Sequence, residues 1–231
     1  MKTSILTMLA ELISPRTCHV CGCRLAPAED VLCTACLMTL PRTGFAATPL
    51  DNEMARLLWG RIDVERCAAL TFYSPHAQHS SVVYELKYRN RPETGQWMGR
   101  LIAREMASEG FFEGIDAIVP VPLAPARERE RGYNQSMQIA QGIASVTGLP
   151  VLNGVVQRTS FTRSQTSVSR DQRGHNVEHA FALTDAAAAR GRHLLFVDDI
   201  VTTGATIGAC AKVVQAAGDV KVSVVSWGLA K

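Results

Sequence analysis

Two adjacent carboxylates, Asp198 and Asp199, stand between an apolar run and a loop rich in hydroxyl groups. The apolar run, residues 194–197, is typical of a strand buried on both faces of a parallel sheet. Neighbouring residues of a strand point to opposite faces, so such a pair in mid-strand would force one carboxylate into apolar packing. We therefore expect both aspartates where the strand ends, at the open edge of the sheet.

The loop after this pair precedes apolar residues with helical spacing. It consists of Thr202, Thr203, Gly204, Ala205 and Thr206. Backbone N–H groups at a helix start, together with threonine hydroxyls, suit a phosphate dianion. Two carboxylates suit vicinal sugar hydroxyls or a divalent cation. A phosphate and a cis-diol one sugar ring apart describe a ribose 5-phosphate. The alternative interpretation of residues 194–206 is a buried strand followed by a capped helix without a ligand. That interpretation does not explain why an acidic pair, a hydroxyl-rich loop and a helix start follow one another.

Arginines gather in the segment 120–176, which contains seven of them, three acidic residues and no lysine, for a formal charge of +4. Arginine is favoured over lysine where phosphate is bound in bidentate fashion. The polar stretch 157–176 is long for a connection inside a compact domain, and such loops are often functional. Each arginine taken singly is also explained by surface solubility. As a set they favour a phosphate-binding role.

Four cysteines form two C-x-x-C pairs with eleven residues between them. They are Cys18, Cys21, Cys33 and Cys36. Two such turns facing each other supply the four thiolates that Zn²⁺ takes in structural sites. A module of this size needs the metal to fold. Cys23 and His19 are close enough in sequence to be alternative ligands, and a redox function of the C-x-x-C pairs is the competing interpretation.

Strands and helices are expected to alternate along most of the chain. Apolar runs predict strands at residues 67–73, 115–121, 151–156 and 194–197. Helical spacing predicts helices at residues 82–86, 97–106 after the cap-like Thr94, and 137–146, and from Thr206 onward. This alternation predicts an α/β fold with an open, mainly parallel sheet, whose ligands bind beyond the carboxyl ends of the strands. The basic turn at residues 87–91 is either a solvated loop or part of the site.

Three parts are expected in the 231 residues: a zinc-ribbon-like module with an N-terminal helix (1–45), a linker (46–63) containing a short helix near 52–59, and an α/β domain (64–231). No apolar run approaches the 18 residues of a membrane span. Residues 1–13 predict a short helix rather than a signal peptide. The net charge of +3 does not by itself imply nucleic-acid binding. Seven cysteines, an odd number with tight pairs, favour a reducing compartment, so we expect a cytoplasmic protein.

Residues 194–206 resemble the phosphoribosyl pyrophosphate (PRPP) motif of the type I phosphoribosyltransferases. The resemblance implies this family's fold for the α/β domain and Mg²⁺ bound together with PRPP. It implies that Asp198 and Asp199 hold the ribose hydroxyls and that the loop 202–206 holds the 5′-phosphate. It further implies a pyrophosphate-binding loop after the strand at 115–121. The residues of that loop are Arg127, Arg131, Asn134 and Gln135.

The segment 157–176 corresponds to the loop that closes over the site in that family. Its candidate residues are Arg163, Gln165, Arg170, Arg173 and Asn176. By the same resemblance the reaction transfers phosphoribose to a nitrogen nucleophile and releases pyrophosphate. The residues expected to carry it are Asp198, Asp199, Arg127, Arg131 and Arg173.

A narrower resemblance covers most of the chain and is to the competence protein F (ComF) family. It rests on the C-x-x-C pairs, the Leu86-Lys87-Tyr88 run, the Arg131-Gly-Tyr-Asn-Gln135 run and the PRPP motif. Members in naturally transformable bacteria are implicated in the uptake of single-stranded DNA. Two functions are therefore expected: a PRPP-dependent transferase with an unidentified acceptor, or a non-enzymatic PRPP sensor that handles single-stranded DNA with the competence machinery. In the basic loops, Tyr133 and Phe161 are the aromatic residues available to stack on bases.

Overall fold

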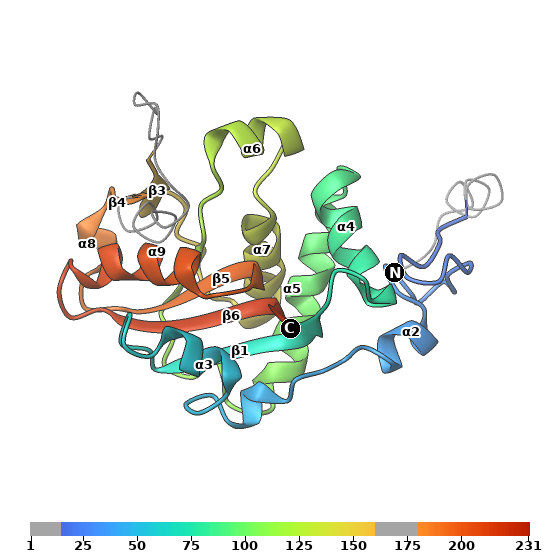
Figure 1. Ribbon diagram of the computed structural model, residues 1–231, viewed down its shortest axis with the longest axis horizontal. Helices are drawn as coiled ribbons and strands as arrows, with labels where there is room; N and C mark the ends of the chain where they lie inside the picture. The colour runs from blue at the N-terminus through green and yellow to red at the C-terminus, as the bar shows by residue number, and fades with distance from the viewer. Residues whose placement is uncertain (1–14, 160–179) are drawn as a thin grey trace, which may run out of the picture.

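The structure is a computed structural model that describes residues 15–159 and 180–231 (Figure 1). Its main sheet contains β1 (Arg66–Tyr73), β2 (Ala117–Pro120), β5 (His193–Val201) and β6 (Lys221–Ala230). The strands lie in the order β1-β6-β5-β2, and every pairing between them is parallel. The expectation of an α/β fold with an open parallel sheet is confirmed.

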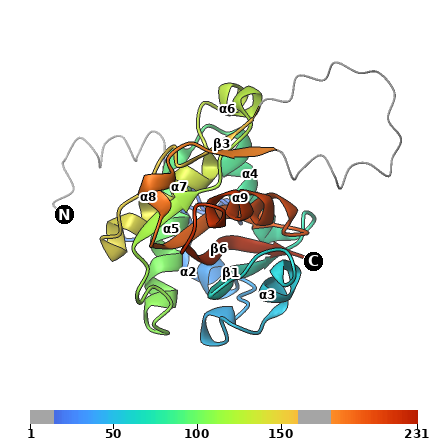
Figure 2. The same ribbon diagram turned by 90° about the vertical axis from the view of Figure 1, so that its left-hand side faces the viewer.

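Helices cover both faces of this sheet (Figures 1 and 2). On one face lie α5 (Pro92–Ala107) and α7 (Gln135–Thr147), and on the other lie α3 (Glu53–Leu58) and α9 (Ala205–Gln215). The axes of α5 and α7 approach closely because glycines face each other. A Cβ atom at Gly99 would lie 2.0 Å from the carbonyl oxygen of Ile139, and one at Gly142 would lie 2.1 Å from that of Gln96.

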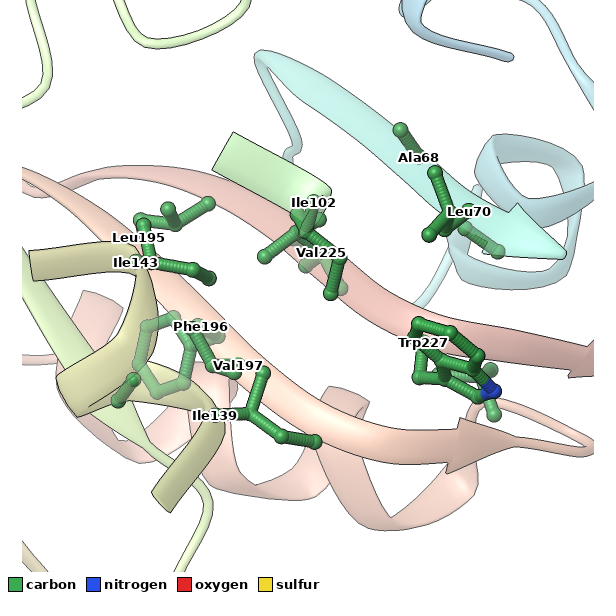
Figure 3. Close-up of a cluster of buried hydrophobic side chains, with 14 of the residues drawn as sticks. Ala68, Leu70, Ile102, Ile139, Ile143, Leu195, Phe196, Val197, Val225 and Trp227 are labelled. Carbon is green, nitrogen blue, oxygen red and sulfur yellow. The ribbon is translucent and has the colours of Figure 1, made fainter. Parts of the chain in front are cut away.

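The core lies between these layers. In Figure 3, Ile102 of α5 and Ile139 and Ile143 of α7 lie over strand residues that include Leu195 and Val225, all of them fully buried. Burying a side chain of this size contributes about 1.5–3 kcal/mol relative to leaving it exposed. The predicted strand 194–197 is therefore the centre of β5, paired with β2 on one side and β6 on the other.

The shorter elements lie around the sheet. The helices are α2 (Thr34–Met38), α4 (Ser81–Tyr88), α6 (Pro125–Arg131) and α8 (Ala186–Ala189), and the 3-10 turns are η1 (Phe45–Ala47) and η2 (Gln78–Ser80). A separate antiparallel hairpin consists of β3 (Val156–Arg158) and β4 (Phe181–Leu183).

The predicted strand at residues 151–156 is wrong. Only Val151 pairs in parallel with Ile118 of β2, as an isolated bridge. The chain then turns at Gly154, whose φ of +89° is a conformation that glycine adopts without strain. Val156 consequently begins β3 rather than ending a strand of the main sheet. The Asn153-Gly154 dipeptide inside the run is a turn signal, which the strand prediction overlooked.

One helix begins earlier than the sequence analysis predicted, and one helix was not predicted. Helix α5 begins at Pro92, and Thr94 is fully buried within it rather than capping it. Proline suits the first turn of a helix because its missing N–H would have no partner there. The loop after β2 contains an unexpected helix, α6, which begins in the same way at Pro125.

The segment expected to be a linker contains α3, as predicted. Asn52 caps this helix through its side-chain oxygen, which accepts hydrogen bonds of 3.0 Å from the amides of Met54 and Ala55. Met54 and Leu58 are fully buried, and α3 packs on β1. The division into residues 1–45, 46–63 and 64–231 stays a prediction, and the helix expected at 1–13 lies outside the described residues. Among the described helices, none is long and apolar enough to span a membrane.

Candidate functional site

The acidic pair lies where β5 outruns its shorter neighbour. Pairing with β2 ends at Val197, whereas pairing with β6 continues to Val201. The two aspartates are thus inside β5 but beyond the end of β2, which leaves one side of the strand open. The expectation that the pair marks the strand end holds on the β2 side only.

Each aspartate has a partner from a different helix. Asp198 Oδ1 accepts a hydrogen bond of 2.9 Å from the hydroxyl of Ser136, in the first turn of α7. Asp199 Oδ2 lies 2.9 Å from the ammonium of Lys87, in the last turn of α4. Sequence reasoning named neither partner as a site residue. The signals for Lys87 were its place in the basic turn 87–91 and in the Leu86-Lys87-Tyr88 run of the family resemblance.

Burial raises the pKa of Asp198 to about 7, and the adjacent charge of Asp199 adds to the shift. The hydrogen bond from Ser136 and the charge of Lys87 act in the opposite direction. An opposite charge or a hydrogen-bond donor favours the carboxylate, whereas burial disfavours it. The pKa of Asp198 is raised overall, so burial is the dominant cause. Asp198 therefore changes between a neutral carboxyl group and a carboxylate acceptor near neutral pH.

The hydroxyl-rich loop and Asp198 share one small cavity of about 30 Å³. Its lining includes Thr202, Gly204, Ala205 and Thr206. Gly204 has φ +70° and precedes the first residue of α9, so the loop presents the helix N-terminus to the cavity. Helix α3 packs against this loop so closely that a Cβ atom at Gly204 would lie 2.9 Å from Leu58 Cδ2.

The loop after β2 is held by its own side chains. Asn134 caps α7 by accepting from the amide of Ser136 at 3.0 Å, and it donates to the carbonyl oxygen of Val121 at 3.0 Å. Gln135 is buried and its Oε1 accepts from Arg131 Nη1 at 2.7 Å. Asn134 and Gln135 therefore fix the conformation of this loop. Their expected role toward pyrophosphate stays a prediction.

The two arginines expected in this loop occupy different settings. Arg131 is half-buried, with its guanidinium 5.6 Å from the centre of the Tyr88 ring on α4. Arg127 is exposed on α6, and the described residues offer its side chain no hydrogen-bonding or ionic partner. Beside them, a groove of about 560 Å³ runs between the α6 segment and β3. Arg163, Gln165, Arg170, Arg173 and Asn176 lie outside the described residues.

The four cysteines converge as predicted. The sulfur atoms of Cys18, Cys21, Cys33 and Cys36 all lie within 4.8 Å of one another. Cys21 Sγ and Cys33 Sγ are 3.7 Å apart, close to the roughly 3.8 Å that tetrahedral zinc with 2.3 Å bonds imposes. The donor set thus fits a structural zinc ion.

The two alternative ligands are not part of the four-sulfur set. His19 uses Nε2 to accept a hydrogen bond of 3.0 Å from Arg91. Cys23 is exposed at the edge of the cluster, where its thiol contacts those of Cys21 and Cys33. A second contact, the paired hydrogen bonds of Arg42 to Glu105 at 2.6 and 2.7 Å, also fixes the N-terminal region to the α/β domain.

These features define the class: an α/β protein with an acidic pair and a hydroxyl-rich loop at the carboxyl edge of a parallel sheet, and a four-cysteine cluster near its N-terminus. No family model matches the chain. Competence protein F of Haemophilus influenzae is 30% identical over 159 residues, which cover 66% of this chain and 67% of that protein. The chain belongs to the competence protein F (ComF) family.

Other relatives extend over the whole length. The DNA utilization proteins YhgH of Salmonella typhimurium and Escherichia coli are each 29% identical over 230 residues, covering 95% of this chain and 99% of theirs. Among solved structures, the glutamine PRPP amidotransferase of B. subtilis, complexed with ADP and GMP, is similar over 58% of this chain and 26% of its own. That similarity has a TM-score of 0.40 and 20% identity.

Proposed function

We propose that this protein binds PRPP together with Mg²⁺ and transfers its phosphoribosyl group to an acceptor, with release of pyrophosphate. The observation that carries the proposal is the cavity shared by Asp198 and the loop 202–206. A carboxylate there accepts hydrogen bonds from the ribose hydroxyls. The loop amides and threonine hydroxyls donate to the 5′-phosphate.

In such a reaction the bond from ribose C1 to pyrophosphate breaks and a bond from C1 to the acceptor nitrogen forms, while the acceptor loses a proton. The sugar passes through an oxocarbenium-like state, so the charge that develops on the leaving group must be stabilised. Bound Mg²⁺ supplies part of this stabilisation. We assign the rest to Arg131 and Arg127 on α6 and to Arg173. The groove beside α6 offers space for the acceptor.

The test is calorimetric titration of PRPP with Mg²⁺ into the wild-type protein and the Asp198→Ala/Asp199→Ala variant. We expect binding by the wild type and none by the variant. Glu109→Ala, which removes an exposed carboxylate just beyond the C-terminal end of α5, is the matched control and should bind normally. Undiminished binding by the double variant would contradict the proposal. If the variant fails to bind, measuring pyrophosphate release by the wild type with candidate bases, amines and nucleic acids identifies the acceptor.

We also propose that the cysteine cluster binds one structural zinc ion through Cys18, Cys21, Cys33 and Cys36. The spacing of the four sulfur atoms supports this assignment. The N-terminal module has a single short helix, α2, among its described residues, and a closed zinc site would stabilise so small a unit. Its thiolates would require a reducing compartment, in line with the proposed cytoplasmic location.

Single-stranded DNA handling with the competence machinery is a second candidate function, and one feature of α4 favours it. The rings of Tyr84 and Tyr88 lie 5.1 Å apart and are 51% and 61% exposed. Arg89 lies over the first ring at 5.8 Å and Arg131 over the second at 5.6 Å. Exposed aromatic rings beside arginines are the usual surface on which single strands stack. Relatives named for competence and for DNA utilization support this candidate.

This surface was not expected from the sequence. Tyr133, one of the two aromatic residues considered there, is half-buried and donates its hydroxyl to the carbonyl oxygen of Leu86. The other, Phe161, lies outside the described residues. Arg89 is a neighbour of the pair on α4 in the sequence, whereas Arg131 is brought beside Tyr88 by the fold.

The second candidate is tested by fluorescence anisotropy with a labelled single-stranded oligodeoxynucleotide. Tyr84→Ala/Tyr88→Ala should weaken binding at least tenfold, since stacking contributes about 1–3 kcal/mol per base. Trp59→Ala, which removes an exposed ring elsewhere, should bind like the wild type. Equal affinities of wild type and double variant would exclude this surface.

A further inference from the structure

Lys87 is the one residue of the basic turn 87–91 that reaches the acidic pair. Its side chain is 22% exposed and that of Asp199 is 13% exposed, with 2.9 Å between ammonium and carboxylate. By contrast, Arg89 and Arg91 of the same turn are exposed. Interpreting the turn as a solvated loop is therefore wrong for Lys87. Removing the ammonium and the carboxylate from water costs free energy, and an apolar residue at position 87 would avoid that cost.

The position of Lys87 is fixed from both sides. The preceding residue, Leu86, is fully buried, and its carbonyl oxygen accepts a hydrogen bond from the Tyr133 hydroxyl. The following residue, Tyr88, holds its ring against the guanidinium of Arg131. Tyr133 and Arg131 both belong to the loop after β2, the one expected to bind pyrophosphate. Lys87 thus lies between the acidic pair and that loop.

The Lys87 ammonium has more N–H donors than its one described partner can accept. It carries three N–H groups, and within the part of the chain that the structure describes Asp199 is its only partner. The remaining N–H groups are available to a ligand that occupies the same site. An anion bound between the aspartates and Arg131 would find a second cation there.

We propose that Lys87 is a further ligand-binding residue, which contacts the pyrophosphate group of PRPP while it orients Asp199 toward the ribose. This inference rests on the proposed function and deepens it, because it adds to the expected pyrophosphate-binding loop a residue from α4 that lies outside the PRPP motif 194–206. It predicts that Lys87 distinguishes PRPP from ribose 5-phosphate, which has the same 5′-phosphate and sugar but no pyrophosphate.

The experiment compares affinities for PRPP and for ribose 5-phosphate, both with Mg²⁺, by calorimetry. Lys87→Met should reduce the preference for PRPP by about tenfold or more, the usual effect of losing a charge-assisted hydrogen bond. Lys87→Arg, which keeps the charge, should retain most of the preference. Lys221→Met, an exposed lysine at the amino end of β6, is the matched control and should behave like the wild type.

Lys87→Met leaves Asp199 without its cation, so its thermal unfolding must be recorded alongside. If this variant does not fold, Lys87→Met/Asp199→Asn is compared with Asp199→Asn alone, and the same loss of preference is expected. Equal weakening of both ligands would reduce Lys87 to a residue that orients Asp199, and unchanged affinities would remove it from the site. Failure of the wild type to bind PRPP would instead refute the proposed function itself.

Discussion

The hydroxyl of Ser136 donates a hydrogen bond of 2.9 Å to Asp198 Oδ1, which joins the first turn of α7 to the end of β5. Ser136 is itself buried, and its amide is capped by Asn134. The loop after β2 and the acidic pair are therefore connected through one serine. If that loop moved on ligand binding, the hydrogen bond from Ser136 to Asp198 would change with it.

Replacing Ser136 with alanine should raise the pKa of Asp198 still further. The serine donor favours the carboxylate form, so its removal favours the protonated form. The loss of the hydrogen bond should also lower the free energy of unfolding by about 1–2 kcal/mol. Carbon-detected NMR titration of the carboxyl group checks the pKa, and an unchanged or lowered value would contradict this role.

The raised pKa of Asp198 predicts how stability depends on pH. The folded pKa of about 7 lies above the ordinary value of 3.8, so between these values the folded state binds more protons than the unfolded state. The contribution of this group to stability is therefore full below pH 4 and is lost as the pH rises toward 7. Urea denaturation of wild type and Asp198→Asn checks this. The difference in unfolding free energy, wild type minus variant, should fall over this range, and a rise would refute the shift.

Removal of the metal should destabilise the N-terminal module. Protein purified without added zinc should contain about one equivalent, and Cys33→Ser should contain far less because it removes one of four ligands. Elemental analysis by mass spectrometry gives the stoichiometry. Cys23→Ser is the matched control, since Cys23 lies beside the cluster but is not one of its four sulfur atoms, and it should keep its zinc. Loss of zinc in that control alone would make Cys23 the ligand.

The close contact of α5 and α7 predicts that Gly142→Ala destabilises the protein. The added Cβ atom would lie 2.1 Å from the carbonyl oxygen of Gln96, so the helices must separate, at a cost of about 1–3 kcal/mol or more. Gly208→Ala in α9 is the control, because its nearest neighbour would be at 3.8 Å. That variant should be neutral or more stable by up to about 1 kcal/mol, since alanine favours helix. Similar unfolding midpoints of the two variants would contradict the contact.

The extent to which sequence alone predicted the site depends on how local each feature is. The strand at 194–197, the loop 202–206 and the start of α9 follow one another in the chain, and their patterns identified them correctly. The same holds for the four cysteines, since each C-x-x-C pair closes its own turn. The strand expected at 151–156 failed because its apolar residues divide between a bridge to β2 and a separate hairpin.

The amino-acid sequence by itself determined the fold class, the order of acidic pair and hydroxyl-rich loop, and the cysteine cluster, because these depend on neighbours along the chain. Only the tertiary structure decided that Ser136 and Lys87 are the partners of the two aspartates, and that Arg131 lies against Tyr88. Those contacts join residues more than 40 positions apart. Their formation depends on how α4 and α7 pack at the carboxyl edge of the sheet, and no local periodicity encodes that packing.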